Sequence, residues 1–309
     1  MFSILIPSWN NLPYLKLCID SIRRHSAFDH EIIVHVNEGT DGTLKWVREQ
    51  GIRHTASRGN VGVCVAMNDA ARLATREWIL FMNDDMVCLP GWDKALYAAA
   101  QEIGESVPMY LSAQLIEPIG TSNTQVTVAN YGTTPENFDE PGLLAFGAGL
   151  KSVDRHGFAA QPMLTQTRLW HMVGGYSIEF GPGMSSDDDF LMKIWLAGCR
   201  TFRIVAGCHL YHFACATTRR VRRNKGGRTF ILKWGISQQA FVRDYVRKTG
   251  EANAQSLPNI PEPTFAGRIK RAVYALAPRY PLGDLRNWEP DLPRQIAMNP
   301  ALGEHIAAE

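Results

Sequence analysis

The sequence predicts an α/β fold in which a mostly parallel central sheet is flanked by helices. Four short apolar runs alternate with three segments of helical spacing in about the first eighty residues. The apolar runs are continuous rather than alternating, which is typical of strands buried on both faces. Polar residues follow the ends of these runs, where open α/β sheets bind their ligands.

Each element of the first half has its own signal. The first run, at residues 2–7, ends at a proline, and the helical segment after it repeats apolar residues three or four positions apart. Gly51 closes a second helix, and Pro90 stands near the first turn of a later one, where proline is tolerated. Strands are expected at residues 2–7, 31–36, 52–57 and 77–83, and helices at 11–26, 39–51, 60–74 and 90–103.

The pattern is weaker between residues 107 and 170, where Gly, Pro, Thr and Asn are frequent, so we expect short strands and loops that shape a substrate site. Acidic residues and Gly198 mark the start and the end of a helix at 187–198. Further along we expect a strand at 200–205, one helix over 229–249, a proline-rich linker at 256–265 and a basic helical segment at 265–277.

Composition excludes some classes of protein. The 309 residues are 45% hydrophobic, which allows a sizeable core, and a net charge of +2 predicts no general attraction to nucleic acid. The six cysteines form no CxxC pair, and the opening residues lack the basic start of a signal peptide, so we expect a cytoplasmic protein. No apolar stretch is long enough to cross a bilayer, although a peripheral contact with its inner face stays open.

Asp84 and Asp85 directly follow the apolar run that ends near Asn83. Adjacent carboxylates repel each other and resist burial. At a strand end they suit a hard divalent cation, which prefers oxygen ligands and bridges phosphate oxygens. The alternative is an exposed turn that caps the next helix.

Two further groups of residues suggest chemistry. Asp187, Asp188 and Asp189 begin a helix, where they either stabilise the helix N-terminus or provide a base whose pKa is raised by repulsion and burial. His209 and His212 come just after a predicted strand, and either could be structural or a metal ligand. Neither GxGxxG nor GxxxxGK[ST] occurs, which disfavours nicotinamide enzymes and P-loop NTPases.

Five segments together carry a family resemblance. "FSILIPSWNNLPYLKLCIDSI", "EIIVHVNEGTDGT", "SRGNVGVCVAMNDAARLATREWILFMNDD", "MVGGYSIEFGPGMSSDDDFLMKIWLAGCRTFRI" and "HLYHFACATT" occur in the order seen in family 2 glycosyltransferases, and the chain resembles that family over roughly residues 2–218. The resemblance implies a GT-A (nucleotide-diphospho-sugar transferase) fold. It also implies a catalytic domain at 1–218, with a nucleotide-binding half at 1–106 and an acceptor and sugar half at 107–218. A basic loop and helix at 219–255 and a linker with a helical C-terminal extension at 256–309 would follow.

The resemblance also assigns site residues. Asp85 is implied as the metal ligand by position, with His212 closing the metal site. Asp187 matches the general base and Asp189 a second acid, but Ser186 stands where the family usually has Glu, so Asp188 stays an alternative base. The residues implied in binding the nucleotide sugar are Pro7, Ser8, Trp9, Asn10, Asn37, Glu38, Arg58, Asn60, Gly62, Asn68, Asn83 and Asp84.

The implied reaction is transfer of a sugar from a UDP-, GDP- or dTDP-sugar to a hydroxyl, with inversion and with Mn²⁺ or Mg²⁺ as the cofactor. A glycan or a lipid-linked acceptor, in polysaccharide or glycolipid biosynthesis, would supply the hydroxyl. The basic segment at 219–228 is either a solvated loop or a contact for a lipid-linked diphosphate. The segment at 265–277 either lies on an anionic membrane or packs on the catalytic domain or a second subunit of an oligomer, and we favour packing.

Two rival functions fit parts of this pattern. An inactive nucleotide-sugar or glycan-binding module would explain Ser186 and Asn37, which replace the acidic residues usual in the family. A nucleotidyltransferase would also use a metal and two acidic groups, but it would form a diphosphate bond. Retention of both acidic clusters favours the glycosyltransferase.

Overall fold

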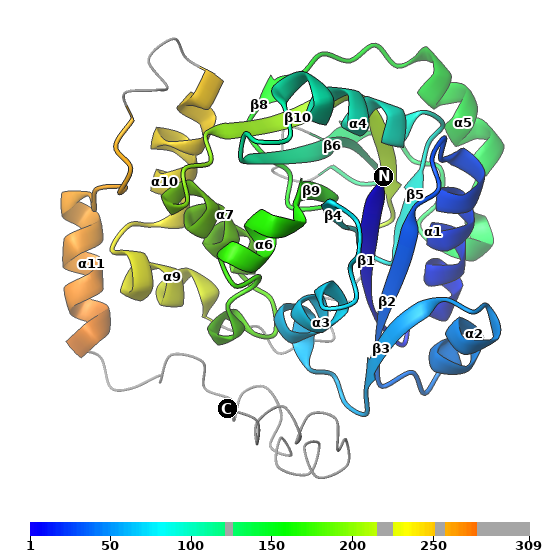
Figure 1. The fold of residues 1–309 in the computed structure, drawn as a ribbon, viewed down its shortest axis with the longest axis horizontal. Coiled ribbons are helices and arrows are strands. Elements are labelled where there is room, and N and C mark those ends of the chain that lie inside the picture. The colour runs from blue at the N-terminus through cyan, green and yellow to red at the C-terminus, as the bar shows by residue number, and fades with distance from the viewer. Residues whose placement is uncertain (121–125, 215–224, 251–256, 277–309) are drawn as a thin grey trace.

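The computed structural model describes residues 1–120, 126–214, 225–250 and 257–276. In these residues one ten-stranded sheet runs through the middle of the molecule, with helices on both faces (Figure 1). The strands are β1 (Phe2–Trp9), β2 (Glu31–Asn37), β3 (Arg53–Ser57), β4 (Trp78–Phe81), β5 (Met86–Cys88), β6 (Met109–Glu117), β7 (Thr127–Val128), β8 (Arg155–His156), β9 (Met163–Gln166) and β10 (Thr201–His212). The helices are α1 (Leu12–His25), α2 (Thr43–Glu49), α3 (Gly62–Ala71), α4 (Trp92–Ile103), α5 (Glu140–Gly149), α6 (Thr167–Met172), α7 (Ser186–Leu196), α9 (Gly226–Trp234), α10 (Gln238–Asp244) and α11 (Phe265–Leu276).

The sheet is mostly parallel, as predicted. Its order is β3-β2-β1-β4-β9-β6-β10-β5, with β7 paired to β6 and β8 paired to β10. Strands β1 to β4 pair in parallel, and so do β6 and β10. Strand β9 is antiparallel to both β4 and β6, and β5 is antiparallel to β10. The sheet therefore continues without a break from the first half of the chain into the second.

Successive side chains of a strand point to opposite faces of the sheet, so most of the hydrophobic core is divided into two clusters, one on each face. Phe2, Ile4 and Ile6 of β1 pack in one cluster with α1 and α4, whereas Leu5 belongs to the other cluster with α3, α6 and α7. Helices α1 and α3 lie on opposite sides of the strands in Figure 1. Burial of both strand faces explains why these runs are apolar throughout. All five cysteines in the described residues are buried free thiols.

The prediction for residues 107–170 was incomplete. Strand β6 is buried along all nine of its residues, and α5 is a ten-residue helix rather than a loop. The apolar residues of α5 include three glycines and show little helical spacing, so its sequence lacked the pattern that predicts a helix.

The prediction of one helix over 229–249 is wrong. Helix α9 ends at Gly235, which adopts a left-handed conformation with φ of 76°. Ser237 then caps α10, because its hydroxyl accepts a hydrogen bond from the amide of Ala240. A glycine stop followed two residues later by a serine cap is a sufficient signal for two helices.

Strand β10 is longer than expected. It continues to His212, with an irregularity in its pairing with β6 between Ile204 and His209. Gly207, with φ of 76°, lies within the irregularity and interrupts the apolar pattern. His209 and His212 therefore belong to the strand rather than to a loop after it.

Helices α9 and α10 fall in the segment 219–255 and α11 in the predicted C-terminal extension, and all three lie at the outer edge of the molecule (Figure 1). Residues 219–224 of the basic segment, 251–256 and most of the C-terminal extension, 277–309, lie outside the described residues. Within the part of the chain that the structure describes, no helix has both the length and the apolar character needed to cross a bilayer.

Candidate active site

The carboxyl ends of the parallel strands carry most of the predicted site residues. Trp9 ends β1, Asn37 ends β2, and Asp84 follows β4 closely. Glu117 and His212 end the neighbouring strands β6 and β10 in the second half of the sheet. Parallel pairing brings these ends to one edge, which is where ligands of open α/β sheets bind.

Trp9, Asn10 and Glu38 form one polar group at this edge. The indole Nε1 of Trp9 and the amide Nδ2 of Asn10 donate to the same Glu38 oxygen, Oε2, at 2.8 and 2.7 Å. Asn10 and Glu38 have φ values of 46° and 62°, a region that non-glycine residues rarely adopt. Residues held in such conformations are often functional, because the surrounding structure must maintain them.

Pro7 and Ser8 lie inside β1 rather than beyond it, paired with His35 and Val36 of β2. The hydroxyl oxygen of Ser8 is buried and has no hydrogen-bond partner among the residues described. A buried polar group without a partner is uncommon in folded proteins and often belongs to a functional site.

Two predicted residues organise the loop between β3 and α3. The Asn37 side-chain oxygen accepts hydrogen bonds from the Val61 amide at 2.9 Å and from the Ser57 hydroxyl at 3.2 Å. The Asn60 side-chain oxygen accepts from the amide of Gly62 at 2.9 Å. Arg58 lies in the same loop and is exposed.

Gly62 and Asn68 connect α3 to the segment that leads into α7. The Asn68 side chain donates to the Tyr176 carbonyl at 2.7 Å and accepts from the Tyr176 amide at 2.8 Å. A Cβ atom on Gly62 would come within 2.8 Å of the Pro182 Cα atom, so only glycine allows this approach. These two residues position the segment that leads to Asp187, a role that the sequence did not indicate.

Asp85, His212 and Glu117 form a buried chain of charges. His212 Nε2 lies 3.4 Å from Asp85 Oδ1, and His212 Nδ1 lies 2.8 Å from Glu117 Oε1. Burial opposes the imidazolium charge, but Asp85 and Glu117 outweigh it and raise the pKa of His212 to about 10. The structure therefore distinguishes His212 from His209, whose pKa is lowered by burial.

The neighbouring acidic residue is also buried. Asp84 Oδ1 accepts a hydrogen bond from the Asn11 side chain at 3.0 Å. Half-buried Asn83 accepts a weak hydrogen bond from the Cys18 thiol through its backbone carbonyl, at 3.6 Å. The alternative of an exposed turn is wrong, because Asp84 and Asp85 are only 7% and 5% exposed.

Asp85 and His212 fit a divalent cation. The facing atoms of the two side chains lie 3.4 Å apart, and both could hold one cation once the His212 ring has lost its Nε2 proton. Glu117 holds the other ring nitrogen, as carboxylates commonly do behind a ligating histidine. In the described residues no three His, Cys, Asp or Glu side chains converge on one metal position.

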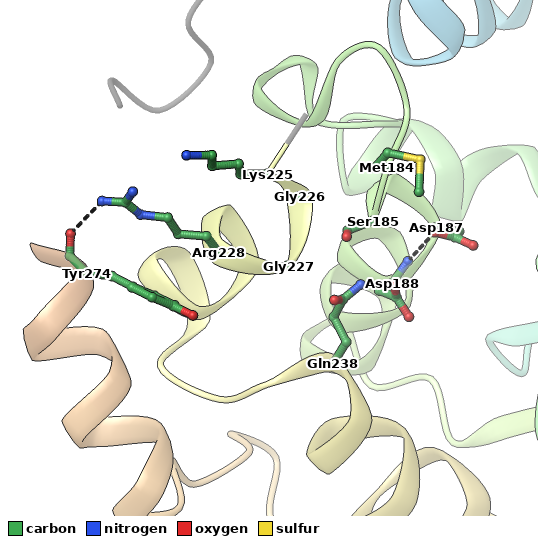
Figure 2. Close-up of a pocket in the computed structure, with 10 residues that line it drawn as sticks. All are labelled: Met184, Ser185, Asp187, Asp188, Lys225, Gly226, Gly227, Arg228, Gln238 and Tyr274. Atoms are coloured by element: carbon green, nitrogen blue, oxygen red, sulfur yellow. Dashed lines mark hydrogen bonds between the residues drawn. The ribbon is translucent and has the colours of Figure 1, made fainter. Parts of the chain in front are cut away.

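Asp187 and Asp188 line an open cavity of about 690 Å³ between the N-termini of α7 and α9 (Figure 2). The other lining residues are Met184, Ser185, Lys225, Gly226, Gly227, Arg228, Gln238 and Tyr274. Gly226 permits the close packing of the two helices, because a Cβ atom there would lie 2.1 Å from the Met184 carbonyl oxygen.

Burial raises the pKa of both carboxyl groups in this cavity. For Asp188, burial and then the charge of Asp187 raise the pKa to about 8. Burial also raises the pKa of Asp187. The amide of Asp188 donates a hydrogen bond to the Asp187 carboxylate at 3.0 Å, which lowers that pKa, but burial outweighs it. Gln238 donates a hydrogen bond to Asp188 (Figure 2). Because the two carboxyl groups are adjacent, they titrate as a coupled pair, and the charge of one opposes ionisation of the other.

Asp189 has a different environment from the two residues before it. It is fully buried and accepts hydrogen bonds from the Ser177 hydroxyl at 2.5 Å and the Trp234 indole at 2.8 Å. Lys233 Nζ lies 2.9 Å from its carboxylate. These contacts tie α7 to α9, so Asp189 serves to position the helix.

Sequence reasoning missed two residues of the site. Glu117 ends β6 in a region whose pattern was too weak to show a strand, so no signal marked it as the partner of His212. Gln238 lies about fifty residues after Asp188 and reaches it only because Gly235 turns the chain between α9 and α10. That turn could have been predicted, but the contact could not.

Part of the sequence matches known proteins. Residues 3–146 match the sequence profile of glycosyl transferase family 2. The PGL/p-HBAD biosynthesis glycosyltransferase of Mycobacterium tuberculosis is 36% identical over 119 residues, which cover 35% of this chain and 43% of that protein. The uncharacterized glycosyltransferase EpsJ of Bacillus subtilis is 31% identical over 90 residues, covering 28% of this chain and 26% of that protein. The matches therefore span less than half of each relative.

A solved structure matches more of the chain. The mannosyltransferase PcManGT of Pyrobaculum calidifontis, in complex with GDP-Man and Mn²⁺, has a TM-score of 0.50 and 14% identity. The match covers 98% of this chain and 82% of that one. It concerns the fold alone, and it confirms the predicted GT-A architecture.

Proposed function

We propose that the chain transfers a sugar from a nucleotide diphosphate sugar to a hydroxyl acceptor with inversion, because residues 3–146 match the sequence profile of glycosyl transferase family 2. The observation that carries this proposal is the open cavity that Asp187 and Asp188 line together. Acid–base work at neutral pH needs a carboxyl group whose pKa has been raised, and burial raises both here.

The proposed reaction is a single displacement. Ionised Asp187 accepts the proton of the acceptor hydroxyl as its oxygen forms a bond to the anomeric carbon. The bond between that carbon and the donor phosphate oxygen breaks, and the nucleoside diphosphate leaves with the electron pair. Asp188, held by Gln238, keeps its proton and positions Asp187 in the first turn of α7.

The other polar group at the sheet edge is assigned to the donor. Trp9, Asn10 and Glu38 would bind the nucleotide. Asp85 and His212 are the residues that would hold Mn²⁺ or Mg²⁺, which neutralises the charge of a departing diphosphate when bound. The mannosyltransferase of similar fold was solved with Mn²⁺ and GDP-Man, which supports this assignment.

We propose a glycan or a lipid-linked molecule as the acceptor, in polysaccharide or glycolipid biosynthesis. The Mycobacterium tuberculosis relative is named as a glycosyltransferase of PGL/p-HBAD biosynthesis. Lys225 and Arg228 line the cavity together with the carboxyl pair, so it can take an acceptor that carries negative charge.

Incubation of the full chain with UDP-, GDP- and dTDP-sugars and Mn²⁺, followed by measurement of released nucleoside diphosphate, tests the reaction class. A glycosyltransferase releases nucleoside diphosphate from one of the donors, and more when an acceptor is added. A binding module would release none, and a nucleotidyltransferase would consume nucleoside triphosphate instead. The absence of release from every donor, despite measurable donor binding, would refute the proposed function.

A further inference from the structure

Helix α11 is attached to the molecule along one side only. It lies at the outer edge of the fold beside α9 (Figure 1). Arg228 of α9 donates to the Tyr274 carbonyl at 2.9 Å, and its guanidinium lies 5.3 Å from the centre of the Tyr274 ring. A Cβ atom on Gly267 would come within 2.9 Å of the Gly235 carbonyl oxygen. Gly267 and Tyr274 therefore mark the side that faces the protein.

The opposite side of α11 carries an apolar stripe that the described residues leave uncovered. The stripe consists of Phe265, Ile269, Val273 and Leu276, which are 80, 50, 56 and 84% exposed. At about 100° per residue these positions share one arc of the helix, and Gly267 and Tyr274 lie across the axis from it. The expectation that the apolar face of this helix packs on the catalytic domain is thus wrong for the described part of that domain.

Basic residues border the apolar stripe. By the same helical geometry Arg268 and Lys270 fall on its two flanks, and Arg271 lies next to Arg268. Helix α11 contains no acidic residue, and the nearest one in the sequence, Glu262, precedes it by three positions. An apolar stripe with cations on both flanks matches a surface that has an apolar interior and anionic headgroups.

We propose that α11 docks the protein on an anionic lipid surface, with its apolar stripe in the acyl boundary and Arg268 and Lys270 among the headgroups. Tyr274 lines the cavity that contains Asp187 from the other side of α11, so docking brings that cavity to within one helix diameter, ~10 Å, of the lipid surface. An acceptor carried by a lipid would then reach the carboxyl pair without leaving the membrane. This last point rests on the proposed function, whereas the docking itself does not.

Vesicle sedimentation of the full chain tests the docking. We expect binding to vesicles of phosphatidylcholine with one third phosphatidylglycerol, weak binding to pure phosphatidylcholine, and release as NaCl is raised. The double variant Ile269→Ser/Val273→Ser should lose at least about tenfold in affinity. Arg268→Gln/Lys270→Gln should lose about fivefold for each cation removed.

Matched controls use exposed residues away from α11. Ile119→Ser/Val153→Ser removes two apolar side chains of comparable exposure, 66 and 70%, and Lys45→Gln/Lys94→Gln removes two exposed cations. Both controls should bind vesicles like the unmodified chain.

Three results would overturn the docking. The first is a chain that ignores anionic vesicles, and the second is equal loss of binding in the α11 variants and their controls. The third is an apolar stripe covered by a second copy, in which case Ile269→Ser/Val273→Ser would turn a dimer into a monomer in light scattering. Sedimentation needs no sugar transfer, so its outcome is independent of the nucleotide-release assay.

Discussion

At the scale of single residues, the acidic pair at the start of α7 lowers the stability of the fold, and we propose that it does so for catalysis. Asp187 and Asp188 lie next to each other in a half-buried position, where burial favours the neutral form of both. A buried hydrophilic pair of this kind lowers the stability of the fold whenever both groups are charged. Sites that tolerate such a cost are commonly functional.

Replacement of Asp188 by Asn should make stability less dependent on pH. The unfolded chain ionises Asp188 near pH 4, whereas the folded chain keeps the proton up to about pH 8. The carboxyl group therefore costs nothing below pH 4, and stability falls as the pH rises towards 8. We expect Asp188→Asn to raise the Tm at pH 8, by about 2–4 °C for each kcal/mol relieved, and to leave it unchanged at pH 4.

Thermal unfolding followed across this pH range, with Asp20→Asn as an exposed control, measures the effect. A Tm difference that is the same at pH 4 and pH 8 would show that the pair is not strained in the fold.

Replacement of Asp85 by Ala should weaken metal-dependent nucleotide binding. Loss of one of two protein ligands, with His212 left beside Glu117, should reduce the affinity for UDP or GDP in Mn²⁺ by about 10–100-fold. Titration calorimetry with and without Mn²⁺ measures this, and the exposed Asp29→Asn variant is the control. Unchanged affinity would remove Asp85 from the metal site.

The positions of the candidate site residues were largely predictable, because each stands at a strand or helix end that the sequence marks. Asp85 follows an apolar run, and Asp187 opens an acidic helix. The sequence pattern alone could not show that His212, rather than His209, lies beside Asp85. Only the pairing of β10 with β5 shows which imidazole ring reaches Asp85. Contacts across the sheet depend on register, which local patterns do not encode.

At the scale of elements, α3 acts as a support for the segment before α7. Asn68 holds the backbone of Tyr176, and the amide of Val63 donates to the Pro182 carbonyl at 2.9 Å. The residues that the family resemblance assigns to the nucleotide thus also connect the two halves of the chain. The resemblance indicates where such residues lie, but it does not show which neighbours they hold.

Replacement of Gly62 by Ala should be more damaging than the same change at Gly51. Both glycines have positive φ, 75° and 63°, so the backbone strain is similar. A Cβ atom at Gly62 collides with Pro182, whereas one at Gly51 meets nothing within 4 Å. We expect Gly62→Ala to cost about 1–3 kcal/mol beyond Gly51→Ala, measured by chemical denaturation.

The same comparison should appear in sugar transfer, because displacement of Pro182 moves the start of α7. Equal stability of the two variants would show that Pro182 and the segment before α7 can move away from α3 without loss of stability.

The error over residues 229–249 has a local cause. Aromatic spacing suggested one helix, but Gly235 and Ser237 provide a stop and a new cap. The break is what brings Gln238 to Asp188. The glycine stop and the serine cap were sufficient to predict this break, whereas helical periodicity was not.

At the scale of the whole molecule, one sheet joins the predicted nucleotide-binding half to the predicted acceptor half. The first four strands and their helices followed from periodicity, because buried parallel strands carry a strong apolar signal. The order of β9, β6, β10 and β5 did not, since their pairings join residues far apart in the chain. Family resemblance therefore predicted the architecture better than local pattern did beyond residue 107.

The central claim is that Asp187 is the base of a sugar transfer. Nucleotide release and donor binding by Asp187→Asn, measured beside the unmodified chain in Mn²⁺, test it most directly. We predict that Asp187→Asn leaves the donor affinity unchanged and reduces the acceptor-dependent rate by at least about 100-fold, the usual contribution of general base catalysis. Transfer by Asp187→Asn at close to the original rate would contradict it.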